Sequence, residues 1–134
     1  MLKTHKVVAA IIKNQNREIL FAQRRSTDKY LPYFWEFPGG KINKEETPIE
    51  ALTREIYEEL ELNIKIESKF MDNVHIYPFA RIELKSYLAT CSQNEFKKNE
   101  HENVLWLKKE KAQDLKLAPA DIPIFQKLLI TNWP

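Results

Sequence analysis

The chain has 134 residues, of which 43% are hydrophobic and 30% are charged, and its formal net charge is +2. This length and composition are typical of one globular domain, and we expect a single domain over residues 1–134. The single cysteine, Cys91, excludes an intrachain disulfide, and the longest apolar run, Val7 to Ile12, is too short to span a membrane. The N-terminus does not resemble a secretory signal, so the sequence predicts a cytoplasmic protein without a membrane partner.

The first third of the chain predicts strands and one polar loop. In chain order these are a buried strand at Lys6–Ile12, its partner at Glu18–Arg24, a loop at Ser26–Tyr33 and a short strand at Trp35–Phe37. The short strand leads into Gly39 and Gly40, the only glycines in the chain.

A well-marked helix is predicted next. Thr47 and Glu50 have the spacing of a capping box, Pro48 suits the first helical position, and helix formers continue to about Leu60. One apolar stripe is predicted at Ile49, Leu52, Ile56 and Leu60. The helix therefore has one face suited to packing against a core.

An acidic face lies beside that stripe. Glu55, Glu58 and Glu59 stand at i, i+3 and i+4, so their carboxylates converge, and like charges so placed destabilise a helix by roughly a few tenths of a kcal/mol per pair. The whole segment from Gly40 to Leu62 has seven acidic and three basic residues, so it carries −4 in a chain that carries +2. A solvated acidic face is the plain interpretation. A hard divalent cation, with an anionic substrate attracted by the basic surroundings, explains the pattern better.

The second half predicts more strands and two short helices. The strands are expected at Ile64–Ile76, Ala80–Cys91 and Val104–Leu107, and the helices at Lys109–Leu115 and Asp121–Ile130. Strands interleaved with packing helices indicate an α/β fold in which a mixed sheet lies between helical layers.

The acidic segment resembles a Nudix box, the signature G-x5-E-x7-R-E-U-x-E-E-x-G-U of nucleoside diphosphate-linked-X hydrolases, where U is a bulky aliphatic residue. Gly40, Glu46, Arg54-Glu55-Ile56, Glu58-Glu59 and Leu62 match the signature in that order. One position departs, because Glu61 stands where the family has a glycine that ends the helix. Asn63, two residues later, is expected to end the helix instead.

The resemblance extends to the MutT branch of the family, which hydrolyses nucleoside triphosphates. It rests on Trp35-Glu36-Phe37-Pro38-Gly39-Gly40-Lys41, on Arg24-Arg25 and on Leu117-Ala118-Pro119-Ala120-Asp121-Ile122-Pro123. It implies a Nudix-type α/β/α sandwich and a reaction that needs Mg²⁺ or Mn²⁺ and releases pyrophosphate and a nucleoside monophosphate. The histidines His5, His75 and His101 lack ligand spacing, so zinc is not expected.

Roles follow from this resemblance residue by residue. The implied metal ligands are the Gly39 carbonyl and the carboxylates of Glu55, Glu58, Glu59 and Glu100, although Glu100 reads equally well as a solvated loop acid. Catalytic roles fall to Arg54, Glu55 and Glu58, with Arg54 orienting a carboxylate and Glu46 holding the loop. Which carboxylate serves as the base is left open. Side-chain chemistry adds Arg25, which can bind phosphate or be a surface charge at a strand end, and an aromatic wall of Phe37, Tyr77 and Phe79, although scattered aromatics are more often core. The residues expected to contact substrate are Arg25, Phe37, Tyr77, Phe79, Arg81 and Asp121.

The nucleobase that the protein recognises is expected to depend on Asp121. An ionised aspartate only accepts hydrogen bonds and suits an exocyclic amine such as that of cytosine, whereas a protonated one also donates. A cap of the last helix is an equally good interpretation of Asp121. The predicted function is hydrolysis of oxidised nucleotides such as 8-oxo-dGTP. Hydrolysis of CTP, dCTP or modified cytosine nucleotides is the alternative, and nucleotide binding without catalysis is a second alternative. A nucleic acid polymer is not expected as a partner, and the chain is expected to be a monomer or a homodimer.

Overall fold

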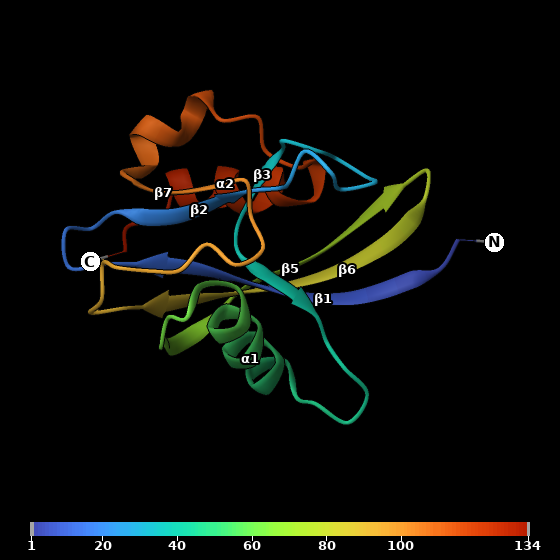
Figure 1. Ribbon diagram of the computed structural model, residues 1–134, viewed down its shortest axis with the longest axis horizontal. Helices are drawn as coiled ribbons and strands as arrows, with labels where there is room; N and C mark the ends of the chain where they lie inside the picture. The colour runs from blue at the N-terminus through green and yellow to red at the C-terminus, as the bar shows by residue number, and fades with distance from the viewer. Residues whose placement is uncertain (1, 134) are drawn as a thin grey trace.

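The computed structural model describes residues 2–133, and its centre is a mixed sheet with a helix on each side (Figure 1). The strands are β1 (Thr4–Lys13), β2 (Ile19–Gln23), β3 (Trp35–Glu36), β4 (Gly39–Lys41), β5 (Lys65–Tyr77), β6 (Ala80–Thr90) and β7 (Asn103–Leu107). The sheet has the order β3-β2-β1-β6-β5, while β4 pairs with β1 and β7 pairs with β2. Only the β1–β6 pairing is parallel among the described strand pairs.

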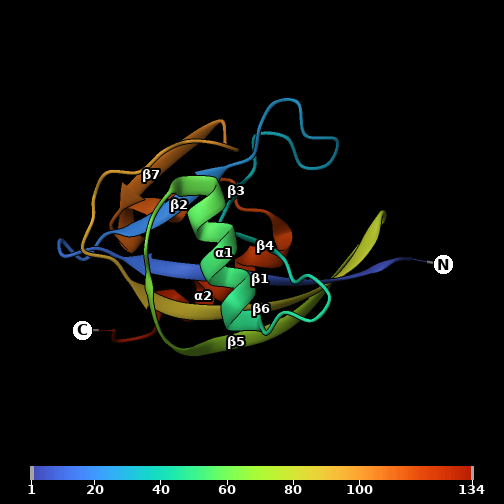
Figure 2. The same cartoon turned by 60° about the horizontal axis from the view of Figure 1, so that its bottom comes forward.

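The helices are α1 (Pro48–Leu60) and α2 (Ile122–Leu129), and two 3₁₀ turns cover Lys109–Asp114 and Pro119–Asp121. Figure 2 shows α1 crossing the front of the sheet, with α2 behind it. The predicted α/β fold with a mixed sheet is confirmed. None of the described helices combines the length and the apolar composition that crossing a membrane needs.

Strand β1 divides the interior into two cores, because successive side chains of a strand point to opposite faces. On one face, Ala9 and Ile11 share a core with Ile124, Phe125 and Leu128 of α2. On the other face, its alternate residues pack in a second core with α1; this set comprises Val8, Ala10, Ile12, Leu52, Ile56 and Leu60. The unbroken apolar run in β1 is therefore the sequence of a strand buried on both faces.

Helix α1 begins as the sequence predicts. Thr47 Oγ1 accepts from the Glu50 N–H at 3.2 Å and Glu50 Oε1 accepts from the Thr47 N–H at 2.9 Å, so the capping box is confirmed. The stripe is confirmed at Leu52, Ile56 and Leu60, which are fully buried. Ile49 was wrongly included in it, because this residue of the first turn is half exposed.

The end of α1 differs from expectation. Glu61 itself takes the left-handed conformation, with φ of 52°, and its N–H donates to the carbonyl oxygen of Tyr57. The assignment of the helix exit to Asn63 was therefore wrong. A left-handed residue other than glycine costs roughly 1 kcal/mol or more. The Glu61 carboxylate accepts from Asn99 Nδ2 at 3.1 Å, which ties this strained position to the loop before β7.

Other secondary-structure elements also differ from those predicted. The glycine pair lies inside a strand, β4, which the sequence did not predict. The helix expected at Lys109–Leu115 is a 3₁₀ turn, and the last helix begins at Ile122 rather than Asp121. These short elements are set by tertiary contacts rather than by local propensity.

Candidate active site

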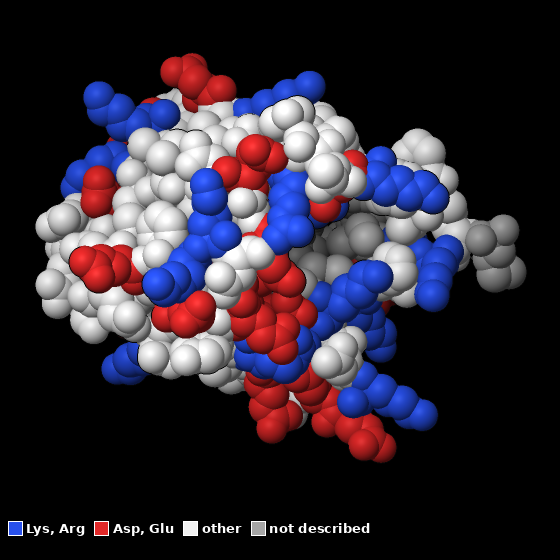
Figure 3. Space-filling model, viewed as in Figure 1, with Lys and Arg blue, Asp and Glu red and all other residues white. Residues whose placement is uncertain are grey.

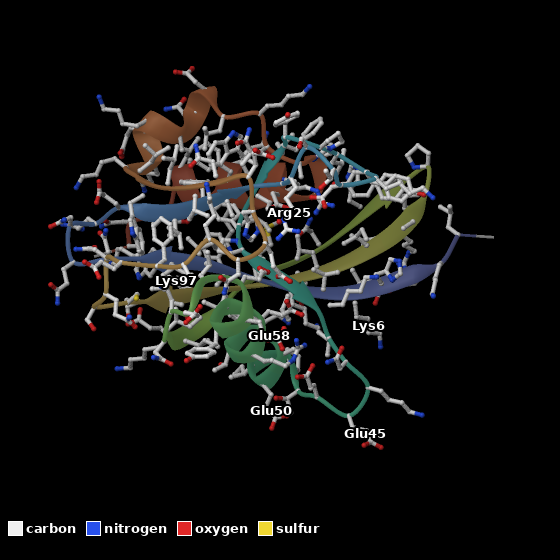
Figure 4. The ribbon with its side chains drawn as sticks, viewed as in Figure 1. Lys6, Arg25, Glu45, Glu50, Glu58 and Lys97 are labelled. Carbon is white, nitrogen blue, oxygen red and sulfur yellow. The ribbon has the colours of Figure 1, made fainter. Side chains whose placement is uncertain are left out.

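The acidic segment divides into groups with different tasks. Glu45 and Glu50 point away from the body of the molecule, whereas Glu58 lies on α1 below Arg25 (Figure 4). Glu46 and Glu58 each contact Arg54. Only Glu55 and Glu59 of this segment turn inward and meet a third acid from a distant loop, Glu100.

These three carboxylates form a cluster. One oxygen from each of Glu55, Glu59 and Glu100 lies within 4.8 Å of the other two. Glu59 has only 5% of its side chain exposed, and its Oε2 is buried without a hydrogen-bond partner among residues 2–133. Burial, and then the negative charges of Glu36, Glu55, Glu100 and Glu58, raise the pKa of Glu59 to about 10. Burial also raises the pKa of Glu55, against the opposing effect of Arg54.

Gly40 leaves the space that Glu55 occupies. A β-carbon on Gly40 would lie 2.5 Å from Glu55 Oε2, too close for any real contact. Gly39 serves another purpose, because a β-carbon there would meet the backbone of β1 at Val8 O and lie 2.8 Å from the Ala9 Cα. Thus Gly39 allows β4 to pair with β1, and Gly40 allows Glu55 to reach the cluster.

Arg54 fixes the orientation of the acids around it. Its Nε and Nη2 donate to the two oxygens of Glu46 at 2.6 and 2.9 Å, and its Nη1 donates to Glu55 Oε1 at 2.9 Å. The Glu46 contact raises the pKa of Arg54, and the same hydrogen bonds lower the pKa of Glu46. A bidentate contact of this kind restrains direction as well as distance. Arg54 lies on α1, where it holds Glu55 toward the cluster and is itself held by Glu46 from the loop before the helix.

The cluster fits a hard divalent cation. Converging carboxylate oxygens, one of them buried and unpaired, are the donor set that Mg²⁺ and Mn²⁺ prefer, and a cation offsets the burial of like charges. Of the predicted ligands, the structure brings together Glu55, Glu59 and Glu100. Glu58 lies outside this group, with 54% of its side chain exposed and its Oε2 3.3 Å from Arg54 Nη1. The role of the Gly39 carbonyl stays a prediction.

A cavity of about 420 Å³ is lined in part by Gly40, which lies against the carboxylate of Glu55 in the cluster. Figure 3 shows acidic side chains next to a hollow that Lys and Arg side chains border. Of the six residues predicted to contact substrate, the cavity is lined by Phe37, Tyr77, Phe79 and Asp121. Arg25 lies outside the lining and donates to the Asn99 carbonyl oxygen at 2.5 Å. Arg81 is also outside it and pairs with Glu83 at 2.6 Å.

Three aromatic rings form a stack at the cavity. Phe79 lies parallel to Tyr77, with ring centroids 4.8 Å apart, and to Tyr30, with ring centroids 3.9 Å apart. Tyr77 Oη accepts from the Ala120 N–H at 2.9 Å, which fixes the ring of Tyr77 at one end of the stack. A planar base has a suitable surface here, because stacking tolerates any aromatic face.

Asp121 faces the cavity rather than the helix that follows it. It makes no side-chain capping bond to α2, and its Oδ2 instead accepts from the Phe37 N–H at 2.8 Å. The capping interpretation is therefore wrong. Burial and then the charge of Glu36 raise the pKa of Asp121 to about 8, so the side chain is mainly protonated at neutral pH and can donate.

Several lining residues were missed from the sequence. Tyr30 and Leu31 come from the loop after β2, and Arg24 and Glu36 form an ion pair at 3.2 Å at the edge of the cavity. Arg24 and Glu36 lie in motifs that match the family, but nothing in the sequence indicates that they pair. Tyr30 lies in a polar loop without the periodicity that would indicate a buried or stacked ring.

Metal should stabilise the folded protein. An ion that binds only the folded state adds RT ln(1 + [L]/Kd), about 2.7 kcal/mol at a hundredfold excess over Kd. We expect Mg²⁺ and Mn²⁺ to raise the melting temperature, measured by calorimetry, and the rise to shrink in Glu55→Gln and Glu100→Gln. An equal rise in wild type and variants would show that these acids do not share the ion.

Comparison with known proteins adds independent evidence. The profile of the NUDIX domain matches residues 3–128. The chain is 31% identical over 128 residues to a CTP pyrophosphohydrolase of Escherichia coli (96% of this chain, 93% of the relative) and 32% identical over 127 residues to an 8-oxo-dGTP diphosphatase of Escherichia coli (95% and 98%). A solved structure of a MutT protein from methicillin-resistant Staphylococcus aureus 252 is 39% identical, with a TM-score of 0.75, covering 96% of this chain and 98% of that one.

Proposed function

The chain belongs to the Nudix hydrolase family, and we propose that it hydrolyses nucleoside triphosphates to a nucleoside monophosphate and pyrophosphate, acting on oxidised nucleotides such as 8-oxo-dGTP. Pyrophosphohydrolase activity on nucleotides, with a divalent cation, follows from the family and from the relatives it matches. The observation that carries the finer proposal is the position of a largely protonated Asp121 in a cavity beside the carboxylate cluster.

The site residues can be given roles in this reaction. Glu55, Glu59 and Glu100 would hold the divalent cation, which neutralises charge on phosphate oxygens and activates water. Arg54 keeps Glu55 in place, and the aromatic stack holds the nucleobase. Glu58 is proposed as the general base, which accepts a proton on its carboxylate, because it stands beside the cluster and is open to solvent.

Arg25 is proposed to bind phosphate. It lies above α1 and Glu58, next to the loop that carries Glu100 (Figure 4). A guanidinium can bind two phosphate oxygens at once. Arg81 is proposed as a weaker contact at the rim, where its ion pair with Glu83 would have to open.

The choice of base has a specific alternative. One oxygen of Asp121 is engaged by the Phe37 N–H, and a protonated carboxyl can both donate and accept, which suits an oxidised guanine edge. An ionised Asp121 would favour the exocyclic amine of cytosine, and one matched relative is a CTP pyrophosphohydrolase. A non-catalytic nucleotide sensor is disfavoured, because such a protein does not need a complete carboxylate cluster.

The proposal is tested by measuring pyrophosphate release from 8-oxo-dGTP, dGTP, dCTP, CTP and 5-methyl-dCTP, each with Mg²⁺ and with Mn²⁺. We expect the highest kcat/KM for 8-oxo-dGTP. A higher kcat/KM for a cytosine nucleotide would select the alternative, and no turnover of any of them would overturn the proposal. The corresponding cellular role is cleaning of the nucleotide pool in the cytoplasm, by a monomer or a homodimer that needs no nucleic acid polymer.

A pH profile tests Asp121 directly. Its pKa is raised in the folded protein, so the side chain is protonated below about pH 8 and ionised above it. The charged or titratable groups that act on it are Glu36, Arg24 and Tyr77. Raising the pH from 6.5 to 9 should lower the ratio of kcat/KM for 8-oxo-dGTP to that for dCTP by about tenfold, since an unmade bond in a dry site costs about 1–3 kcal/mol.

Asp121→Asn provides the control, because an amide donates and accepts at every pH. Its ratio of the two kcat/KM values should be independent of pH and should favour 8-oxo-dGTP. Using a ratio removes effects of pH on the cation site, which both nucleotides share. If wild type and Asp121→Asn give the same pH profile, Asp121 does not read the base.

A further inference from the structure

His101 is a buried residue that the reaction described above does not use. Only 5% of its side chain is exposed, and its Nδ1 is buried without a hydrogen-bond partner in the described chain. Its Nε2 lies between two carboxylates, 3.5 Å from Glu36 Oε2 and 4.0 Å from Glu59 Oε2. A polar ring that is buried at such a cost usually has a task, because burying a polar group without full hydrogen bonding is unfavourable.

The two carboxylates belong to different parts of the site. Glu36 lines the cavity, and its Oε1 accepts from Arg24 Nη1 at 3.2 Å. Glu59 belongs to the carboxylate cluster, and the oxygen that faces His101 is the buried one that lacks a hydrogen-bond partner. A continuous row of side chains therefore runs from Arg24 through Glu36 and His101 to Glu59.

The backbone around His101 is fixed on both sides. The Asn99 N–H donates to the Glu59 carbonyl oxygen at 3.1 Å, which ties the loop to the end of α1. The Glu102 N–H donates to the Gln23 carbonyl oxygen at 2.9 Å, which ties it to β2. His101 is thus held between the helix that supplies Glu59 and the strand that leads to Arg24.

We propose that His101 is a positioning residue that couples the nucleotide cavity to the carboxylate cluster by holding Glu36 on one side and Glu59 on the other. A nucleotide that binds Arg24 or Glu36 alters the contact between Glu36 and His101, and through His101 it favours one orientation of Glu59. If the nucleotide thereby raises the affinity for the cation by some factor, the bound cation must raise the affinity for the nucleotide by the same factor. This inference rests on the proposed function, because it assumes that the cluster holds a cation.

The test compares two amides of different reach. In His101→Gln the side-chain amide nitrogen can take the place of Nε2, whereas in His101→Asn the amide is too short to reach both carboxylates. Loss of a partner that orients a ligand typically weakens metal binding 10- to 100-fold. We expect His101→Asn to weaken Mn²⁺ binding, measured by electron paramagnetic resonance without nucleotide, by 10- to 100-fold, and His101→Gln to stay within about threefold of wild type.

Kinetics separate positioning from loss of structure. In His101→Asn the Mn²⁺ concentration for half-maximal activity should rise by a similar factor, while kcat at saturating Mn²⁺ falls by less than about threefold. Lys97→Gln, an exposed change in the same loop (Figure 4), should leave both quantities unchanged. CMP and dGMP added without turnover should tighten Mn²⁺ binding in wild type and not in His101→Asn.

Each outcome has a distinct meaning. Equal Mn²⁺ affinity in wild type, His101→Gln and His101→Asn would overturn the role of His101 and leave the proposed function intact. Equal weakening by both amides would show that His101 acts only by packing. Absence of Mn²⁺ binding by the wild-type protein would contradict the cation site itself, and the proposed function with it.

Discussion

Glu59→Gln is expected to lower kcat by at least about a thousandfold while the protein stays folded. Glutamine keeps the size of the side chain but removes an anionic oxygen from a cluster that offers three carboxylates to one cation. Losing a single preorganised electrostatic contact in a dry site commonly costs about 10² to 10³ in rate, and a direct ligand should cost at least this much. The rate is measured with saturating nucleotide over a range of Mg²⁺ concentrations.

The same substitution should not harm the metal-free fold. The raised pKa of Glu59 leaves its side chain protonated at neutral pH without metal, so a neutral amide of the same size replaces a neutral acid and the melting temperature without metal should stay close to that of wild type. Glu45→Gln is the matched control, since it changes an exposed acid of the same segment that points away from the body of the molecule. Full activity of Glu59→Gln at moderate Mg²⁺ would exclude Glu59 as a ligand.

The two glycines should respond differently to substitution by alanine, and Gly39→Ala should destabilise the fold severely. Its β-carbon would collide with the backbone of β1 at Val8, which cannot move without breaking the pairing of β4 with β1. We expect a loss of more than about 4 kcal/mol in the free energy of unfolding, in the range seen when a substitution forces severe overpacking. Chemical denaturation measures this loss.

Gly40→Ala is the natural comparison, because its β-carbon would meet the flexible end of the Glu55 side chain rather than backbone. The protein should fold with a loss of about 1–2 kcal/mol at most, since Glu55 can turn aside. Metal binding and turnover should nevertheless fall sharply, because the space that Glu55 uses in the cluster is filled. If Gly40→Ala unfolds the protein, or Gly39→Ala does not destabilise it, the assignment of the two close approaches is wrong.

Features that depend on neighbouring residues were predictable from the sequence. The capping box at Thr47 and Glu50, the buried stripe of α1 and the two-faced burial of β1 all follow from spacing within one element. The pairing of Arg54 with Glu46 and Glu55 is implied by the motif they share, in which Arg54 orients a carboxylate and Glu46 holds the loop. Local rules therefore located α1 and the acids that it carries.

Features that depend on distant segments were not predictable in the same way. Whether Glu58 or Glu59 turns inward depends on the sheet below α1, and both fit the motif equally well as metal ligands. Asp121 was open between cap and cavity until its bond to Phe37 placed it. Tyr30 meets Phe79 only because the loop after β2 and the β5–β6 connection lie together. The proposed role of His101 depends on its contacts with Glu36 and Glu59, which are far from it in sequence.

We propose above all that the carboxylate cluster supports hydrolysis of a nucleoside triphosphate with release of pyrophosphate. Phosphorus NMR of the products from 8-oxo-dGTP with Mg²⁺ tests it most directly, with a parallel sample in which EDTA removes the metal. We expect pyrophosphate and the nucleoside monophosphate with Mg²⁺, and no turnover with EDTA or in Glu59→Gln. Orthophosphate and a nucleoside diphosphate as products, or equal turnover with EDTA, would contradict the claim.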